Sequence, residues 1–154
     1  MKKIMIYTVA LLSMISLVAC KNQKTQTTTV KGIYAKEKQL IMERFDAKNV
    51  SINVEKNVKD SDFPKGYNNI KVSLIGDKKV ALSKAMKVAK KSLATKEEYN
   101  QIYEIRKETA DLAKTLPNQK TAITVGFEKS KGDFEVIAKS SQGRNLIPVG
   151  KPAK

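Results

Sequence analysis

The chain has 154 residues, with 30 lysines and arginines against 15 acidic residues and a formal net charge of +15. It contains no histidine and one cysteine, which excludes a histidine general base, a histidine metal ligand and a disulfide within the chain. Only Arg44, Arg106 and Arg144 are arginines, and lysine lacks the planar guanidinium that reads phosphates and base edges. Because aromatic residues for stacking bases are also few, the composition argues against a nucleic-acid partner.

The first twenty residues carry the most specific pattern in the sequence. Lys2 and Lys3 precede an apolar run from Ile4 to Val18, and this order of a charged and then an apolar region is typical of a secretory signal. The run is shorter than the roughly 20 apolar residues that a membrane-spanning helix needs. The pattern therefore predicts an export signal over residues 1–19.

The four residues Leu17-Val18-Ala19-Cys20 end this signal and resemble the lipobox of bacterial lipoproteins. The resemblance implies thioether lipidation of Cys20, cleavage before Cys20 and acylation of the new amino terminus. It also implies that the protein is anchored by lipid to a membrane of the cell envelope. In some Gram-negative lipoproteins, an acidic cluster just after the cysteine resembles a signal for export to the cell surface. Lys21-Asn22-Gln23-Lys24 contains no acidic residue, so the resemblance implies the side that faces the periplasm. An ordinary cleaved secretory signal is the alternative.

Residues 20–35 are polar and rich in threonine, which predicts a tether between Cys20 and one folded domain over residues 36–140. A flexible chain of this length separates its ends by about 20 Å. Residues 141–154 contain two prolines and two glycines, which predicts a C-terminal tail that either lies on the domain or remains loose.

The first half of the predicted domain reads as a helix followed by two strands. Ile41 and Phe45 share a helical face within residues 36–47. Alternating apolar residues then predict one strand at about 50–58 and another at about 70–74. The loop between them contains Pro64 and Gly66, so the two strands are expected to pair in antiparallel fashion.

Residues from about 80 to 116 are predicted to form two helices separated at Thr95. Thr95 and Glu98 have the spacing of a capping box, so the first helix should end near Leu93 or Ala94 and the second should begin at Lys96. Two apolar faces are expected. The first contains Leu82, Ala85, Met86, Ala89 and Leu93, and the second contains Ile102, Ile105, Leu112, Ala113 and Leu116.

The last predicted pair of strands is a hairpin. Ile123, Val125 and Phe127 alternate with polar residues or glycine before the turn, and Phe134, Val136 and Ala138 follow the turn with the same period of two. The order of all these elements predicts an α+β fold, an antiparallel sheet of about four strands with helices packed on one face. The strand order stays open.

Three lysines of the first central helix are candidates for contact with an anionic surface. Lys84, Lys87 and Lys91 lie opposite the apolar face. Since a lipid anchor would hold the domain near a bilayer, each lysine would gain about 1 kcal/mol from anionic headgroups. The alternative is a solvated face that only keeps the protein soluble.

Two groups of carboxylates are weighed as metal ligands. Asp60 and Asp62 share a loop, and oxygen atoms of this kind suit hard cations. A second group lines the outer side of the second central helix and consists of Glu97, Glu104, Glu108 and Asp111. A solvated surface is the favoured interpretation of both groups, so no metal and no cofactor is predicted.

These observations favour a lipid-anchored protein of the cell envelope that acts as a non-enzymatic binding module. Its expected partners are the membrane, through the anchor, and anionic lipid or an envelope protein. The alternative is a periplasmic hydrolase that uses carboxylates only. The absence of histidine and of a nucleophile motif weighs against this alternative, and no catalytic residue is assigned.

Overall fold

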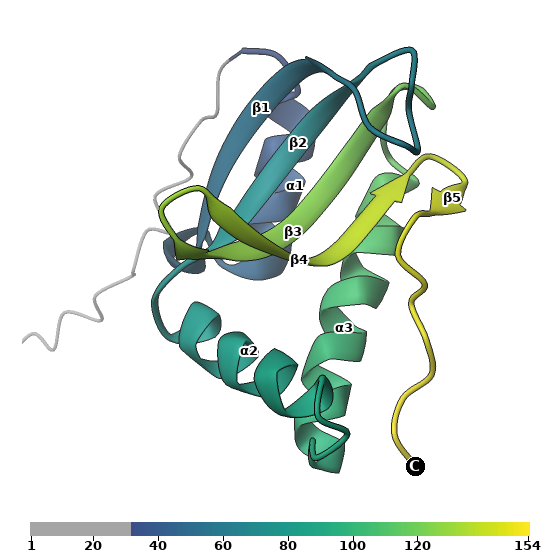
Figure 1. The fold of residues 1–154 in the computed structure, drawn as a ribbon. Coiled ribbons are helices and arrows are strands. Elements are labelled where there is room, and N and C mark those ends of the chain that lie inside the picture. The colour runs from purple at the N-terminus through teal and green to yellow at the C-terminus, as the bar shows by residue number, and fades with distance from the viewer. Residues whose placement is uncertain (1–31) are drawn as a thin grey trace, which may run out of the picture.

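A computed structural model describes residues 32–154. The predicted signal, Cys20 and most of the predicted tether lie outside the described residues. The described chain forms a five-stranded sheet and three α-helices, with the helices on one face of the sheet and the other face open (Figure 1). No helix within residues 32–154 combines the length and the apolar character needed to cross a bilayer.

The strands lie side by side in the order in which they occur along the chain, from β1 to β5. The elements are α1 (Ala35–Phe45), the short 3-10 helix η1 (Ala47–Asn49), β1 (Val50–Val58), β2 (Tyr67–Leu74), α2 (Gly76–Ala89), α3 (Lys96–Ala113), β3 (Thr121–Ser130), β4 (Asp133–Ser141) and β5 (Arg144–Asn145).

The expected combination of helices with one sheet is confirmed, but the sheet differs from the expected antiparallel sheet of about four strands in two respects. A fifth strand, β5, pairs with the end of β4, and β2 and β3 run parallel. The helices between β2 and β3 explain the parallel pair. Because α3 runs back along the sheet, β3 begins at the same end as β2 (Figure 1). Eighteen helical residues rise about 27 Å, which matches the length of a strand of eight or nine residues.

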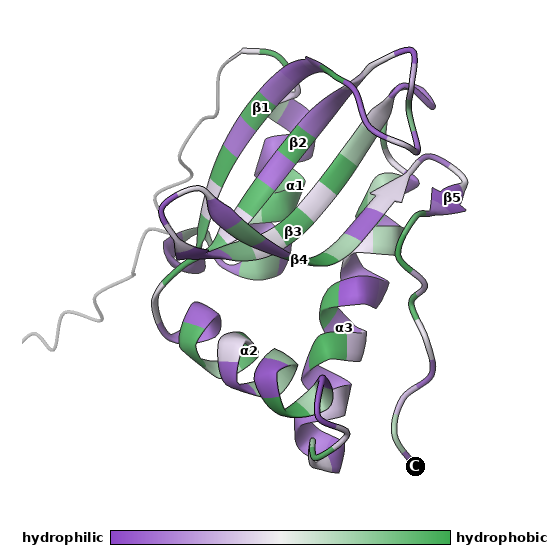
Figure 2. Ribbon diagram, viewed as in Figure 1, coloured by the Kyte–Doolittle hydropathy of each residue, from purple (hydrophilic) through white to green (hydrophobic). Residues whose placement is uncertain are grey.

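The two predicted antiparallel pairs are confirmed. In the first pair, Ile52 lies opposite Val72, and Val54 lies opposite Ile70. Figure 2 shows hydrophobic and hydrophilic residues alternating along these strands. The apolar face of the sheet packs on Ile41 of α1 and on the apolar faces of α2 and α3. Burial of these side chains is the main source of stability for this fold.

The hairpin of β3 and β4 departs from the simple alternation that its sequence suggests. Val125 pairs with Ala138 but Gly126 pairs with Val136, so one extra residue of β4 forms a bulge. The bulge buries Ile137 completely and turns Phe134 towards the open face, where its ring lies beside Gly126. A Cβ at Gly126 would lie 2.1 Å from the carbonyl oxygen of Glu135, so this close approach requires glycine.

The central helices begin and end partly as expected. The capping box of Thr95 and Glu98 is present, and α3 begins at Lys96. By contrast, α2 already begins at Gly76 and ends at Ala89, and Leu93 is 71% exposed rather than part of the apolar face. The helix stops early because Ser92 has a left-handed backbone, while Leu93 N–H donates to Val88. This is the pattern of a Schellman turn.

The C-terminal residues lie on the domain. Beyond β5, the backbone N–H groups of Leu146 and Ile147 donate to the carbonyl oxygen of Lys139. Further along, Ala153 N–H donates to the side-chain oxygen of Asn100 in α3 at 2.8 Å. The last residues therefore run beside α3 (Figure 1).

Candidate functional site

Helix α2 lies across one end of the molecule, and the described chain begins near the opposite end (Figure 1). The turn into α2 is held by η1, because Ile75 N–H donates to the carbonyl oxygen of Asn49 at 2.8 Å. One side of α2 buries Leu82 and Ala85. Its other sides border two hollows, one towards the β3–β4 hairpin and one towards α3.

The hollow between α2 and the hairpin has a volume of about 320 Å³ and is called the lysine groove here. Met86 and Phe127 supply its apolar surface. Its charged lining consists of Lys87, Lys90, Lys91, Lys129 and Glu135. Lysines therefore outnumber carboxylates in this groove by four to one.

Glu135 neutralises only two of the four lysines. Its carboxylate accepts a hydrogen bond from Lys90 at 2.7 Å and lies 3.3 Å from the ammonium of Lys129. The hydrogen bond from Lys90 holds the pKa of Glu135 below its ordinary value, against the smaller opposing effect of burial. Lys87 and Lys91 form no ion pair with any residue from 32 to 154, so their charges remain available to a ligand.

The structure brings two of the three predicted lysines together and separates the third. Lys87 and Lys91 line the lysine groove. Lys84 instead reaches towards α3, where its ammonium lies 3.7 Å from the carboxylate of Glu98. All three side chains are exposed.

Two exposed aliphatic side chains accompany these lysines. Val80 is 69% exposed on α2, and Leu93 is 71% exposed in the turn after it. At 100° per residue, Val80, Lys84 and Lys87 fall within a sector of about 60° on α2, and Lys91 lies in the turn after the helix. We call the five residues Val80, Lys84, Lys87, Lys91 and Leu93 the α2 face. Sequence periodicity did not reveal the aliphatic part of this face, because Leu93 fits the apolar pattern of a longer helix.

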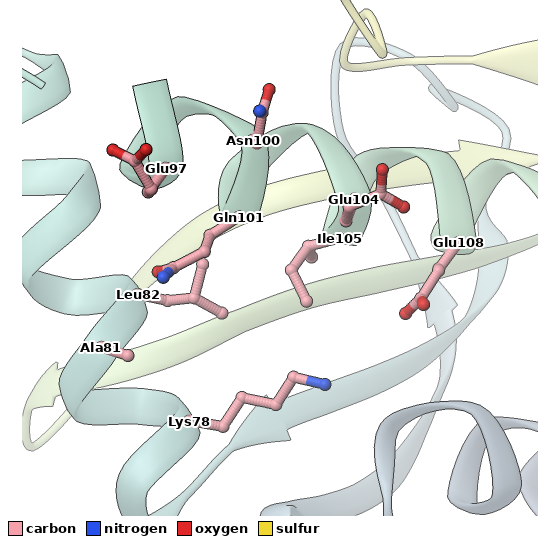
Figure 3. A pocket seen from close by; sticks show the side chains of 9 residues that line it. All are labelled: Lys78, Ala81, Leu82, Glu97, Asn100, Gln101, Glu104, Ile105 and Glu108. Atoms are coloured by element: carbon pink, nitrogen blue, oxygen red, sulfur yellow. The ribbon is translucent and has the colours of Figure 1, made fainter. Parts of the chain in front are cut away.

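The hollow between α2 and α3 is larger, about 440 Å³, and is called the helix cavity here. Its apolar floor is formed by Ala81, Leu82 and Ile105 (Figure 3). Its polar lining consists of Lys78, Glu97, Asn100, Gln101, Glu104 and Glu108. Three residues of the predicted acidic stripe therefore border a hollow, whereas the fourth, Asp111, pairs with Lys114 at 2.6 Å.

The pKa of Glu108, which lines the helix cavity, is shifted from its ordinary value. Burial raises its pKa above the ordinary value, and the charge of Glu104 acts in the same direction. Lys78 and Arg44 oppose this effect without cancelling it. Figure 3 shows Lys78 and Glu108 extending towards one another, but Lys78 lies over the ring of Phe45, 5.2 Å from its centre. The carboxylate of Glu108 has no ion pair within the described part of the chain.

A third charged group lies on the open face of the sheet and was missed from the sequence. The ammonium of Lys139 in β4 donates to Asp60 at 2.7 Å and to Asp62 at 2.9 Å. The same ammonium lies 5.1 Å from the ring centre of Tyr67. The two loop carboxylates that were weighed as metal ligands therefore bind a lysine. We call Lys139, Asp60, Asp62 and Tyr67 the open-face cluster.

The pKa shifts of Lys139 and Asp60 favour a structural rather than a catalytic role for the open-face cluster. Burial lowers the pKa of Lys139, but its hydrogen bonds to Asp60 and Asp62 outweigh burial and leave the pKa above its ordinary value. Burial raises the pKa of Asp60, but hydrogen bonds from Lys139 and Tyr67 outweigh it and leave that pKa low. Lys139 therefore stays a cation at neutral pH and cannot act as a base or nucleophile.

No group of three or more potential metal ligands comes together within residues 32–154. Cys20, the predicted lipidation site, lies outside the described residues. Comparison of the chain with protein-family models, with curated proteins and with solved structures found no match.

Proposed function

We propose that the chain is a lipid-anchored protein of the cell envelope that acts as a non-enzymatic binding module. In this proposal Cys20 carries the lipid, and the α2 face contacts the anionic surface of the membrane that holds the anchor. The observation that carries the proposal is the coincidence of lysines and exposed aliphatic side chains on the α2 face. Amphipathic surfaces of this kind bind at the boundary between headgroups and acyl chains.

The strength of such a contact suits a protein that is already anchored. Each lysine near an anionic bilayer contributes about 1 kcal/mol, and partial burial of Val80 and Leu93 adds a similar amount. A total of a few kcal/mol is weak for a free protein. It is sufficient for a tethered one, because the anchor keeps the effective concentration of the α2 face high.

The length of the chain before the domain is compatible with this orientation. The described chain begins at the end of the sheet opposite α2 (Figure 1). A strand of nine residues such as β1 is about 30 Å long. The eleven residues between Cys20 and Gly32 allow these two residues to lie at most about 40 Å apart. The α2 face can therefore reach the bilayer if this segment runs alongside the domain.

The alternative of a hydrolase that uses carboxylates is less well supported. Asp60 and Asp62 are engaged by Lys139, and Glu135 is engaged by Lys90 and Lys129. A glycosidase needs one carboxyl group that donates a proton and another that remains ionised across a cleft. Among these engaged groups, neither Asp60 nor Glu135 can supply the proton, because both have a lowered pKa.

The first test addresses the anchor. We expect Cys20→Ala to abolish incorporation of a labelled fatty acid and to release the protein from the membrane fraction, because the chain has no other cysteine. Metabolic labelling followed by cell fractionation measures both effects. A variant that stays in the membrane fraction without the label would contradict the proposed anchor.

The second test addresses the α2 face, using residues 20–154 with Cys20→Ala to remove the lipid. We expect this protein to bind phosphatidylglycerol vesicles at low salt and to dissociate as the salt concentration rises, because exposed charges are screened beyond about 8 Å in physiological salt. Changing Lys84, Lys87 and Lys91 to Gln should weaken binding in a co-sedimentation assay.

A matched control removes the same number of charges at the other end of the sheet. The control residues Lys56, Lys59 and Lys65 are exposed in or near the loop between β1 and β2. We expect the variant with these three lysines changed to Gln to bind vesicles more tightly than the α2-face variant. Equal losses in the two triple variants would show that only net charge matters. That result would reject the α2 face as the contact surface.

A further inference from the structure

The helix cavity differs in charge from the rest of the molecule. The chain as a whole carries +15, yet the polar lining of this cavity contains three carboxylates and only one lysine. Glu97, Glu104 and Glu108 lie on one stripe of α3. Glu104 and Glu108 are four positions apart, which places their side chains one above the other. An acidic hollow on a basic protein selects for cationic ligands, because its local potential opposes that of the surrounding surface.

The shape of the cavity selects for a small amphipathic molecule. A volume of about 440 Å³ falls within the range of small-molecule sites. Its floor is aliphatic, formed by Ala81, Leu82 and Ile105, whereas the carboxylates come from α3 alone. A ligand with an apolar body and one charged end can therefore cover the floor while its charge meets Glu104 and Glu108 (Figure 3).

The protein's own cations leave this negative charge incompletely neutralised. Lys78 is the only cation that lines the cavity, and its ammonium lies over the ring of Phe45 rather than within 4 Å of a carboxylate. Glu104 and Glu108 have no ion pair with any residue from 32 to 154. Burial and the charge of Glu104 raise the pKa of Glu108, as expected for a carboxylate that has no cation within ion-pair distance.

We propose that the helix cavity binds a small aliphatic amine, whose ammonium pairs with Glu104 and Glu108 while its alkyl chain covers Leu82 and Ile105. A metal ion alone would leave the apolar floor unused. An anionic amphiphile would be repelled by the three carboxylates. The helix cavity lies on the side of α2 that faces α3, away from the lysine groove.

The experiment titrates residues 20–154 carrying Cys20→Ala with n-hexylamine, which is protonated at neutral pH, and follows the backbone amide signals by NMR. We expect saturable shifts centred on Ala81, Leu82, Gln101 and Ile105. The same titration with 1-hexanol and with hexanoate should give at least about fivefold weaker binding, because neither ligand supplies a cation. Binding of hexanol as tight as that of hexylamine, or hexylamine shifts that do not saturate, would overturn the proposal.

Three single variants separate the effect of the cavity's carboxylates from the effect of net charge. Glu104→Gln and Glu108→Gln should each weaken hexylamine binding at least about threefold and leave hexanol binding unchanged, since only the ion pair is lost. Glu37→Gln on α1 removes one carboxylate that does not line the cavity and should have no effect. If all three variants bind hexylamine equally, the carboxylates are not the site.

A fourth variant tests the position of the ligand without relying on charge. Ala81 is exposed on α2 and contributes to the cavity floor, so Ala81→Phe should fill the cavity without disturbing the buried core. We expect this variant to lose binding of both hexylamine and hexanol by at least about tenfold. Undiminished binding of hexylamine to a folded Ala81→Phe protein would exclude the helix cavity.

Discussion

The open face of the sheet and the end of the molecule around α2 both carry charged side chains, but the two regions differ in how many of these charges form ion pairs. On the open face, Lys139 binds two carboxylates at 2.7 and 2.9 Å, and Lys71 lies 3.5 Å from Glu55. Around α2, by contrast, Lys87, Lys91 and Glu108 form no ion pair with any residue from 32 to 154. Paired charges stabilise the fold, whereas unpaired charges beside a hollow remain available to a ligand.

The geometry of the two regions explains this difference. Neighbouring strands are about 5 Å apart, so side chains that point to the same face of the sheet meet easily. Asn69 illustrates this, because its amide donates to Glu55 at 2.9 Å and accepts from Thr124 at 2.8 Å across three strands. Helices α2 and α3 instead meet along their apolar sides, and Lys84 with Glu98 is the single ion pair between them in the described chain.

The largest expected effect comes from packing on the open face. Gly126→Ala would place a methyl group 2.1 Å from the carbonyl oxygen of Glu135 and 2.7 Å from the ring of Phe134. We expect a loss of about 3 kcal/mol in the free energy of unfolding, because the backbone of β4 has to move. Urea denaturation of this variant and of Ser73→Ala, a change at the paired position of β2, measures the difference. Equal stability of the two variants would contradict the close approach.

The next prediction tests the contrast in charge pairing directly. Lys139→Met should lower the free energy of unfolding by about 2 kcal/mol, because it leaves Asp60 and Asp62 without the cation that they bind. Lys87→Met makes the same chemical change at an unpaired lysine and should alter stability by less than about 0.5 kcal/mol. Urea denaturation compares the two variants. Similar losses in both would show that the lysines around α2 are structural as well.

The pH dependence of stability should reflect the open-face cluster at both extremes. The pKa of Lys139 is raised in the folded protein, so its contribution is complete below the ordinary value of about 10.5 and is lost as the pH rises through the higher folded value. The pKa of Asp60 is lowered, so its contribution is present above about 4 and is lost as the pH falls. Thermal melts of the Lys139→Met variant should show a weaker dependence on pH in both ranges than the unchanged protein.

Local sequence signals predict those parts of the fold that depend on neighbouring residues. Thr95 and Glu98 predict the start of α3 because a capping box involves only four consecutive residues. The alternation of Val50, Ile52 and Val54 predicts β1 because the strand has one face on the core. Both predictions are confirmed, since nothing distant in the chain overrides these local preferences.

The parts that sequence reasoning missed depend on contacts between distant residues. The parallel pairing of β2 with β3 follows from the direction of α3, which periodicity does not specify. Lys139 reads as a polar residue at the end of a strand, and only the fold brings it to Asp60, 79 positions away. The bulge at Ile137 likewise shifts the alternation of buried and exposed residues in β4. It depends on the pairing with β3, where Gly126 allows the backbone of Glu135 to approach closely.

The smallest expected effect is a gain in the free energy of unfolding, and it comes from a substitution in the helix cavity. The pKa of Glu108 is raised, mainly by burial, so the folded protein disfavours its charged form. This penalty is absent below the ordinary value of about 4.3, where the group is protonated in both states, and it appears as the pH rises through the folded value. Glu108→Gln removes the penalty while keeping the size of the side chain.

We therefore expect Glu108→Gln to raise the free energy of unfolding at pH 7, by less than about 1 kcal/mol because the side chain is only half buried. The gain should vanish near pH 3, and Glu37→Gln should show no gain at either pH. Urea denaturation at the two pH values measures these differences. A loss of stability at pH 7 would mean that Lys78 holds Glu108 as firmly as Lys139 holds Asp60. The helix cavity would then be a second structural cluster, without the free carboxylate that an amine requires.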